Sequence, residues 1–379
     1  MENTATTGSL RECMIRIMLA ATPAQRLQCL QRLAALPLVV TSPDTATFCS
    51  RLLLRVMDDD GDDAAITENA CEALLNMIHS LSGVDLTGIA VTALPALVRA
   101  IKRFPGLPGI AMSVAGCFAA LAQKSAVAYS STDKFLGTLV DVMWAFPENV
   151  MLQAVCCVGL GVLDRGVPTP GVGAVLAALG MSLTSPKRRS DDHVTLASQA
   201  LGVFSALSPA SSEFSASVAV PMILCALKVY GADQDVAYRG LKALTSFWTS
   251  SPSGRHAVLK ENGVAPELAA SALARHADVP VVVSSGLRVL ALIAADARGA
   301  QLVASAGGVE AAIRAGAGAK AADAATDMLR ACLAAAADEG LGSAKRARIA
   351  ARVALARHPA HSGVASAATE VLRQVSCNP

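Results

Sequence analysis

Aromatic residues are scarce in this chain: phenylalanine, tyrosine and tryptophan together make up 3% of its 379 residues. β-Sandwiches and barrels rely on aromatic and β-branched residues, so the composition disfavours a β-rich core. Hydrophobic residues nevertheless reach 53%, and alanine supplies much of that fraction. Alanine and leucine are the best helix formers and let helices approach closely. The composition therefore predicts an all-α protein.

The chain also lacks C-x-x-C pairs, long apolar runs and a large net charge. Its ten cysteines lie inside apolar helical runs, where a thiol behaves as a small hydrophobe, and this usage indicates a reducing compartment. No run reaches the ~18 apolar residues that a membrane span needs. We expect a cytoplasmic protein, with cytoskeletal association or a nuclear location as alternatives.

The net charge of +2 gives no overall attraction to nucleic acid, so nucleic acid is not an expected partner. The charge is unevenly distributed, however. Residues 1–100 hold seven Lys/Arg and eleven Asp/Glu, whereas residues 301–379 hold nine Lys/Arg and six Asp/Glu. The two ends of the chain are therefore opposite in charge.

A pattern of apolar residues three positions apart recurs along the chain. We call its first position the anchor; the anchor and the residues three and six positions later (+3 and +6) share one helix face and form the predicted core. The anchors are Leu27, Cys71, Ala115, Cys157, Leu201, Leu241, Leu287, Thr326 and Thr369, which are 39 to 46 residues apart. A second helix is expected before each of them, for example at 91–104, 133–145, 171–183, 218–229, 266–275 and 309–315.

One stretch carries a more specific motif. From Asp278 the sequence reads DVPVVVSSGLRVLALIAAD, and QLVASAGGVEAAIR follows, ending at Arg314. It resembles an armadillo repeat: a long third helix, a short first helix, and a Gly-Gly turn that opens the second helix. Gly263 repeats that turn, because a steep bend leaves no room for a Cβ atom.

The resemblance and the period together predict the architecture. We expect a right-handed α-solenoid of about nine armadillo- or HEAT-like repeats, forming one domain over residues 1–379. Residues 1–8 are predicted to be disordered. The segments 9–36 and 343–379 are predicted to be the N-terminal and C-terminal cap repeats.

The family resemblance implies that the third helices line a concave groove, which binds a partner helix or an extended peptide. Positions +1 and +5 after each anchor fall on the face that would look into this groove, and we call them the groove positions. The predicted partner-binding residues are Glu72, Asn76, Gly116, Ala120, Val158, Val162, Gly202, Ala206, Lys242, Ser246 and Arg288.

The groove positions differ from those of the family's nuclear-import adaptors, which place Trp at +1 and Asn at +5. Only Asn76 matches, which disfavours recognition of basic signals by that mechanism. The middle of the predicted groove is small and apolar, so it forms a trough that could accept a helix. The alternative is that a tighter superhelix or an extra segment buries these helices.

No catalytic or metal motif emerges, so we predict no enzyme activity, cofactor or small-molecule substrate. The acidic run from Asp58 to Asp63 lacks the glycine and distal glutamate spacing of an EF-hand, and a solvated loop is expected instead. His358 and His361 are close in sequence but have no nearby cysteine pair to complete a zinc site.

Two basic segments stand out. Ser185 to Ser190 reads SPKRRS in a loop between helices, which is either an ordinary solvated loop, a phosphorylation site or a nuclear signal. Lys345, Arg348 and Arg352 form a basic patch on one helix face, either as the polar side of a cap repeat or as a contact for an acidic partner.

These observations predict a non-catalytic scaffold or adaptor that binds one or more proteins. Two alternatives remain: a cargo or nuclear-transport adaptor, and a structural component of a large cytoskeletal assembly such as an axoneme.

Overall fold

The structure is a computed structural model that describes residues 2–35, 43–81, 86–124, 132–162, 169–188, 190–207, 209–260, 263–308, 311 and 369. Sixteen α-helices and no strands occur in this part of the chain. The all-α prediction is therefore confirmed. The chain divides into two compact units, residues 1–178 and 179–379.

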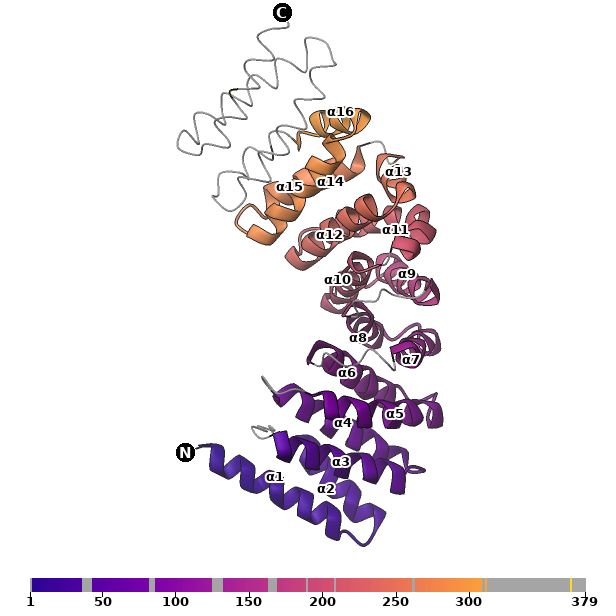
Figure 1. The fold of residues 1–379 in the computed structure, drawn as a ribbon, viewed down its shortest axis with the longest axis vertical. Helices are drawn as coiled ribbons and strands as arrows, with labels where there is room; N and C mark the ends of the chain where they lie inside the picture. The colour runs from indigo at the N-terminus through magenta and orange to yellow at the C-terminus, as the bar shows by residue number, and fades with distance from the viewer. Residues whose placement is uncertain are drawn as a thin grey trace, which may run out of the picture. The chain divides into compact units, whose positions relative to one another are not determined.

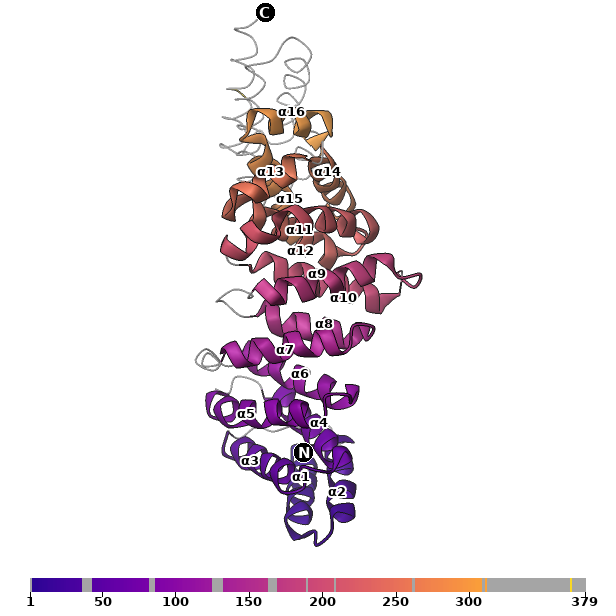
Figure 2. The same ribbon diagram turned by 90° about the vertical axis from the view of Figure 1, so that its right-hand side faces the viewer.

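The first unit consists of repeated helix pairs (Figure 1). Its helices are α1 (Glu2–Leu19), α2 (Pro23–Ala35), α3 (Pro43–Asp59), α4 (Ala64–Ser80), α5 (Thr87–Arg103), α6 (Pro108–Lys124), α7 (Thr132–Ala145) and α8 (Val150–Gly161). Helices α2, α4, α6 and α8 pack one against the next, and α3, α5 and α7 form a second layer that faces the viewer in Figure 2. Helix α1 includes residues 2–8, for which we predicted disorder.

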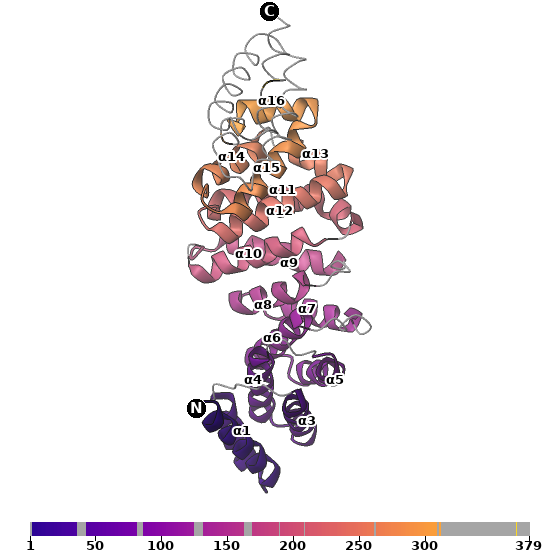
Figure 3. The ribbon, with the colours of Figure 1, turned by 60° about the vertical axis from the view of Figure 1, so that its left-hand side comes forward.

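The boundary between the units lies within α9 (Thr169–Thr184). The second unit continues with α10 (Asp191–Ser205), α11 (Pro209–Tyr230), α12 (Gln234–Ser250), α13 (Pro252–Lys260), α14 (Val264–Arg275), α15 (Pro280–Ala294) and α16 (Ala297–Ser305). Helix α12 packs between α10 and α15 (Figure 3), while α11 contacts both α13 and α14. A short helix, α13, therefore adds a third helix to the pair α14 and α15.

The predicted core is confirmed on seven of the anchor helices. All seven anchors from Leu27 to Leu287 lie in helices, on α2, α4, α6, α8, α10, α12 and α15. Leu27 is half-buried, and the other six anchors are at most 1% exposed. The buried +3 and +6 residues are Leu30, Leu33, Leu74, Met77, Phe118, Leu121, Leu160, Phe204, Leu207, Leu244, Phe247, Leu290 and Ile293. Leu163 and the anchor Thr326 lie outside the described residues. The last anchor, Thr369, is exposed, so its assignment to the core was wrong.

Two glycines make the turns that the motif predicted. Gly263, the N-cap of α14, has φ +90°, and Gly307, two residues after α16, has φ +70°. Both lie in the left-handed region, which side chains other than glycine rarely adopt. They have corresponding positions in successive repeats, because each follows a short helix, α13 or α16.

Polar side chains join several helices to a segment about one repeat earlier. The Nε2 atom of His276 lies 2.9 Å from the carbonyl oxygen of Gly231, and Tyr230 donates its hydroxyl proton to the carbonyl oxygen of Ser182. The separations of 45 and 48 residues are close to the anchor spacings of 39 to 46 residues. A helix leaves its last carbonyl groups without an intrahelical partner. These side chains donate to such carbonyl groups of the preceding repeat.

Candidate partner-binding surface

In the first unit, one groove position of α4 carries an exposed side chain, and the other carries a side chain that is hydrogen-bonded to the preceding repeat. Glu72 is exposed, and Asn76 is half-buried. The Nδ2 atom of Asn76 donates a 2.9 Å hydrogen bond to the carbonyl oxygen of Ala34 at the end of α2. The amide group that matches the import adaptors is thus used between neighbouring repeats.

The small groove positions of α6 do not leave the hollow that we predicted. A Cβ atom added to Gly116 would lie 2.9 Å from Cδ2 of Leu75, so the leucine of α4 already fills the space above this glycine. Ala120 is 2% exposed and cannot contact a partner. Val158 and Val162, at the end of α8, are half-buried. In the first unit the predicted trough is therefore shallower than the sequence suggested.

The second unit shows the same filling at Gly202 on α10. Here Nη1 of Arg239, a residue of α12, lies 2.8 Å from the position of an added Cβ atom. The same atom donates a 2.6 Å hydrogen bond to Oε1 of Gln199, which fixes the guanidinium group over α10. Ala206 and Ser246 are half-buried.

Lys242 and Arg288 are the exposed groove positions of the second unit. They project from α12 and α15, which pack against each other. The Nζ atom of Lys242 lies 6.0 Å from the centre of the Tyr238 ring, a geometry that favours a cation–π contact. We name Tyr238, Arg239, Lys242 and Arg288 the unit 2 surface.

Tyr238 and Arg239 were not predicted from the sequence, because they lie outside positions +1 and +5. They precede the anchor Leu241 by three and two residues, and they share a helix face with Lys242 at spacings of four and three. That spacing is visible in the sequence and would have identified them. Their side chains add an aromatic ring and a third cation to the surface.

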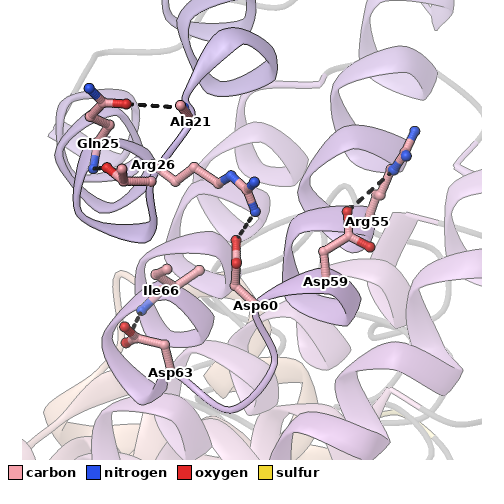
Figure 4. A network of polar contacts seen from close by, with 9 residues as sticks. Ala21, Gln25, Arg26, Arg55, Asp59, Asp60, Asp63 and Ile66 are labelled. Carbon is pink, nitrogen blue, oxygen red and sulfur yellow. Dashed lines mark hydrogen bonds and ion pairs between the residues drawn. The ribbon is translucent and has the colours of Figure 1, made fainter.

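Aspartates of the acidic loop at residues 58–63 form ion pairs with arginine side chains (Figure 4). Asp60 pairs with Arg26 of α2, and Arg55 lies 3.4 Å from Asp59. Arg99 and Arg103 of α5 reach Asp58 at 2.8 Å and Asp62 at 4.0 Å. These contacts join α2, α3 and α5 around the loop.

Asp63 completes this loop by capping α4. Its Oδ1 atom accepts hydrogen bonds from the backbone amides of Ala65 at 2.9 Å and Ile66 at 3.1 Å. Each aspartate of the run therefore has a structural partner. Within the described ranges, no group of three or more His, Cys, Asp or Glu could hold a metal ion.

The predicted basic patch of Lys345, Arg348 and Arg352 lies outside the described residues, as does the predicted C-terminal cap repeat at 343–379 except for Thr369. Among the helices that the structure does describe, none is long and apolar enough to cross a membrane.

Comparison with known proteins identifies the fold only. No protein-family model matches the chain, and no curated protein matches it. Its structure is similar to the crystal structure of an engineered protein determined by the Northeast Structural Genomics Consortium, with a TM-score of 0.59 and 16% sequence identity. The match covers 97% of this chain and 99% of that chain. At this identity the likeness concerns the helical fold and carries nothing about function.

Proposed function

We propose that this protein is a non-catalytic scaffold that binds a partner protein on the exposed face of its anchor helices. The observation that carries the proposal is the placement of Lys242 and Arg288. Both are exposed, and they project from α12 and α15, two adjacent helices whose anchors are buried. A rigid helix row that presents one side chain per repeat suits an extended peptide or a helix laid across it.

The chemistry of the unit 2 surface supports a binding role. Aromatic residues and arginine are enriched at protein interfaces because they combine a large contact area with polar groups. Tyr238, Arg239 and Arg288 supply these residue types. Arg239 is held by Gln199, so part of its ordering cost is met before a partner arrives.

We further propose that the fold is an armadillo-type solenoid, with three-helix units in its second half. The three helices α13, α14 and α15, together with the left-handed turns at Gly263 and Gly307, support this assignment. The two-helix units of residues 1–178 fit a HEAT-like arrangement instead.

Position-specific photocross-linking tests the proposed function. A photoreactive amino acid replaces Ser284 of α15 in one variant and Ser217 of α11 in the other. Both serines are exposed, but Ser284 lies one turn before Arg288 on the same face, and Ser217 lies on a helix outside the row of α10, α12 and α15. Each variant is irradiated in an extract of its native cells.

The proposal predicts a defined covalent partner from position 284 and none, or a much weaker band, from position 217. Equal cross-linking from both positions would indicate non-specific contact. A partner captured from position 217 alone would move the binding face to α11 and contradict the proposal.

A further inference from the structure

The loop between α9 and α10 carries an exposed serine that follows basic residues and lies outside the proposed binding surface. The loop spans residues 185–190, and its last residue, Ser190, is the N-cap of α10. Lys187 and Arg188 stand three and two positions before Ser190, and all three residues are exposed. We propose that Ser190 is phosphorylated by a serine/threonine kinase that selects basic residues ahead of its acceptor.

The hydroxyl group of Ser190 is available for this reaction. It makes no side-chain capping bond to α10, in contrast to Asp63 and Asp233, whose carboxylates cap α4 and α12. The backbone of Ser190 is extended, with φ −73° and ψ 151°. Lys187 and Arg188 lie in a turn, and the backbone amide of Ser190 donates a 2.9 Å hydrogen bond to the carbonyl oxygen of Lys187. Entry into a kinase active site therefore requires this turn to open while the core of α10 stays folded.

Ser185, the other serine of the loop, is a poorer acceptor for the same kinase class. It is half-buried, and its Oγ atom accepts a 3.2 Å hydrogen bond from the backbone amide of Lys187. It is also followed by Pro186 and has no basic residue in the three positions before it. The loop therefore distinguishes its two serines by exposure, hydrogen bonding and neighbouring charge.

The reaction is an ordinary phosphoryl transfer with ATP as co-substrate. The Oγ atom of Ser190 attacks the γ-phosphorus of ATP, and the bond from that phosphorus to the β–γ bridging oxygen breaks. ADP leaves, and the hydroxyl proton passes to the catalytic carboxylate of the kinase.

The phosphate would reverse the net charge of residues 187–192, which include the first two residues of α10. Three cations, Lys187, Arg188 and Arg189, stand in sequence against two anions, Asp191 and Asp192. A phosphoserine adds about two negative charges at neutral pH, so the excess of one positive charge becomes an excess of about one negative charge. A surface whose charge changes sign can gain or lose a charged partner.

The first turn of α10 also contains a buried histidine side chain. His193 is 6% exposed, and its Nδ1 atom has no hydrogen-bond partner among the described residues. Side chains at this third position of a helix can reach back to the N-cap residue. A phosphate on Ser190 would bring acceptor oxygens to this turn, where the helix dipole also favours negative charge.

The test uses the full-length chain with ATP, magnesium and the catalytic subunit of the cyclic-AMP-dependent protein kinase, which prefers basic residues before its acceptor. Phosphopeptide mapping by mass spectrometry follows the reaction with time. We expect phosphate on Ser190, its loss in Ser190→Ala, and unchanged modification of Ser190 in Ser185→Ala. The charge-removing variant K187A/R188A should be modified at least about tenfold more slowly, the factor that corresponds to ~1.4 kcal/mol.

A synthetic peptide of residues 183–196 provides the control for access. Phosphorylation of the peptide without phosphorylation of the folded chain would show that the fold hides Ser190 and would overturn the proposal. Incorporation at Ser185 alone, or equal rates in wild type and K187A/R188A, would do the same. Circular dichroism spectra of the variants should match wild type, since the exchanged side chains are exposed or half-buried.

Discussion

The Nζ atom of Lys124 lies 2.8 Å from the carbonyl oxygen of Ile78, 46 residues earlier in the chain. The same ammonium group reaches the carbonyl oxygens of His79 at 2.9 Å and Leu81 at 2.8 Å. One side chain at the end of α6 thus donates hydrogen bonds to three carbonyl groups at the end of α4. Contacts of this kind hold the repeats in register, because each connects residues one period apart.

Removing this ammonium group should destabilise the protein more than removing an exposed one. For Lys124→Met we expect a loss of about 1–3 kcal/mol in the free energy of unfolding, because three carbonyl groups lose a charged donor. For Lys102→Met, at an exposed position of α5, we expect a change within about 0.5 kcal/mol. Urea unfolding followed by circular dichroism measures both.

The same pair of variants has a second readout at His79. Burial lowers the pKa of His79 from its ordinary value, and the positive charge of Lys124 lowers it further. Lys124→Met should therefore raise the pKa of His79, whereas Lys102→Met should leave it unchanged. An unchanged His79 titration in both variants, followed by NMR, would contradict the contact.

Buried thiols should make the protein less stable in alkali. Burial raises the pKa of Cys71 and of Cys157 from the ordinary value of 9.0 to about 12. Because the pKa of each thiol is higher in the folded state, its stabilising contribution is complete below pH 9 and is lost as the pH rises toward 12. We expect the unfolding free energy of wild type to fall more steeply over this range than that of C71A/C157A. Lysine and tyrosine titration is common to both proteins, so parallel curves would refute the assignment.

Two glycine substitutions should change the stability of the protein in opposite directions. Gly263→Ala places a side chain at φ +90°, and we expect it to cost about 1–2 kcal/mol. The backbone causes this cost, since the nearest atom to the new Cβ would be Leu302 Cδ2 at an ordinary 3.5 Å. Gly88→Ala, in the first turn of α5 with nothing within 4 Å, should instead stabilise the protein by roughly 0.5 kcal/mol. Thermal melts of the two variants should move in opposite directions.

The repeating core could be predicted from the sequence because it depends on a local pattern. Cys71 and Leu241 were assigned as anchors from apolar spacing alone, and both are fully buried. The glycine turn at Gly263 was predictable for a similar reason, since few other residues accept its backbone angles.

The details of the binding face were not predictable, because they depend on contacts between helices. The small residues Gly116 and Gly202 suggested a hollow, but Leu75 and Arg239 of neighbouring helices fill it. Those neighbours are about 40 residues away in the chain, and nothing in the spacing of a single helix identifies them. The bond of Asn76 to the preceding repeat was hidden for the same reason.

The proposed binding function depends most on the unit 2 surface, and the dissociation constant of the partner captured from position 284 tests this surface most directly. The constant is measured by isothermal titration calorimetry for wild type, for K242E/R288E and for the matched control K228E/K260E. The control makes the same change in charge at exposed positions of α11 and α13. We predict that K242E/R288E weakens binding at least about tenfold, a loss of ~1.4 kcal/mol or more, while the control binds like wild type. Equal affinity in all three proteins would contradict the proposed surface.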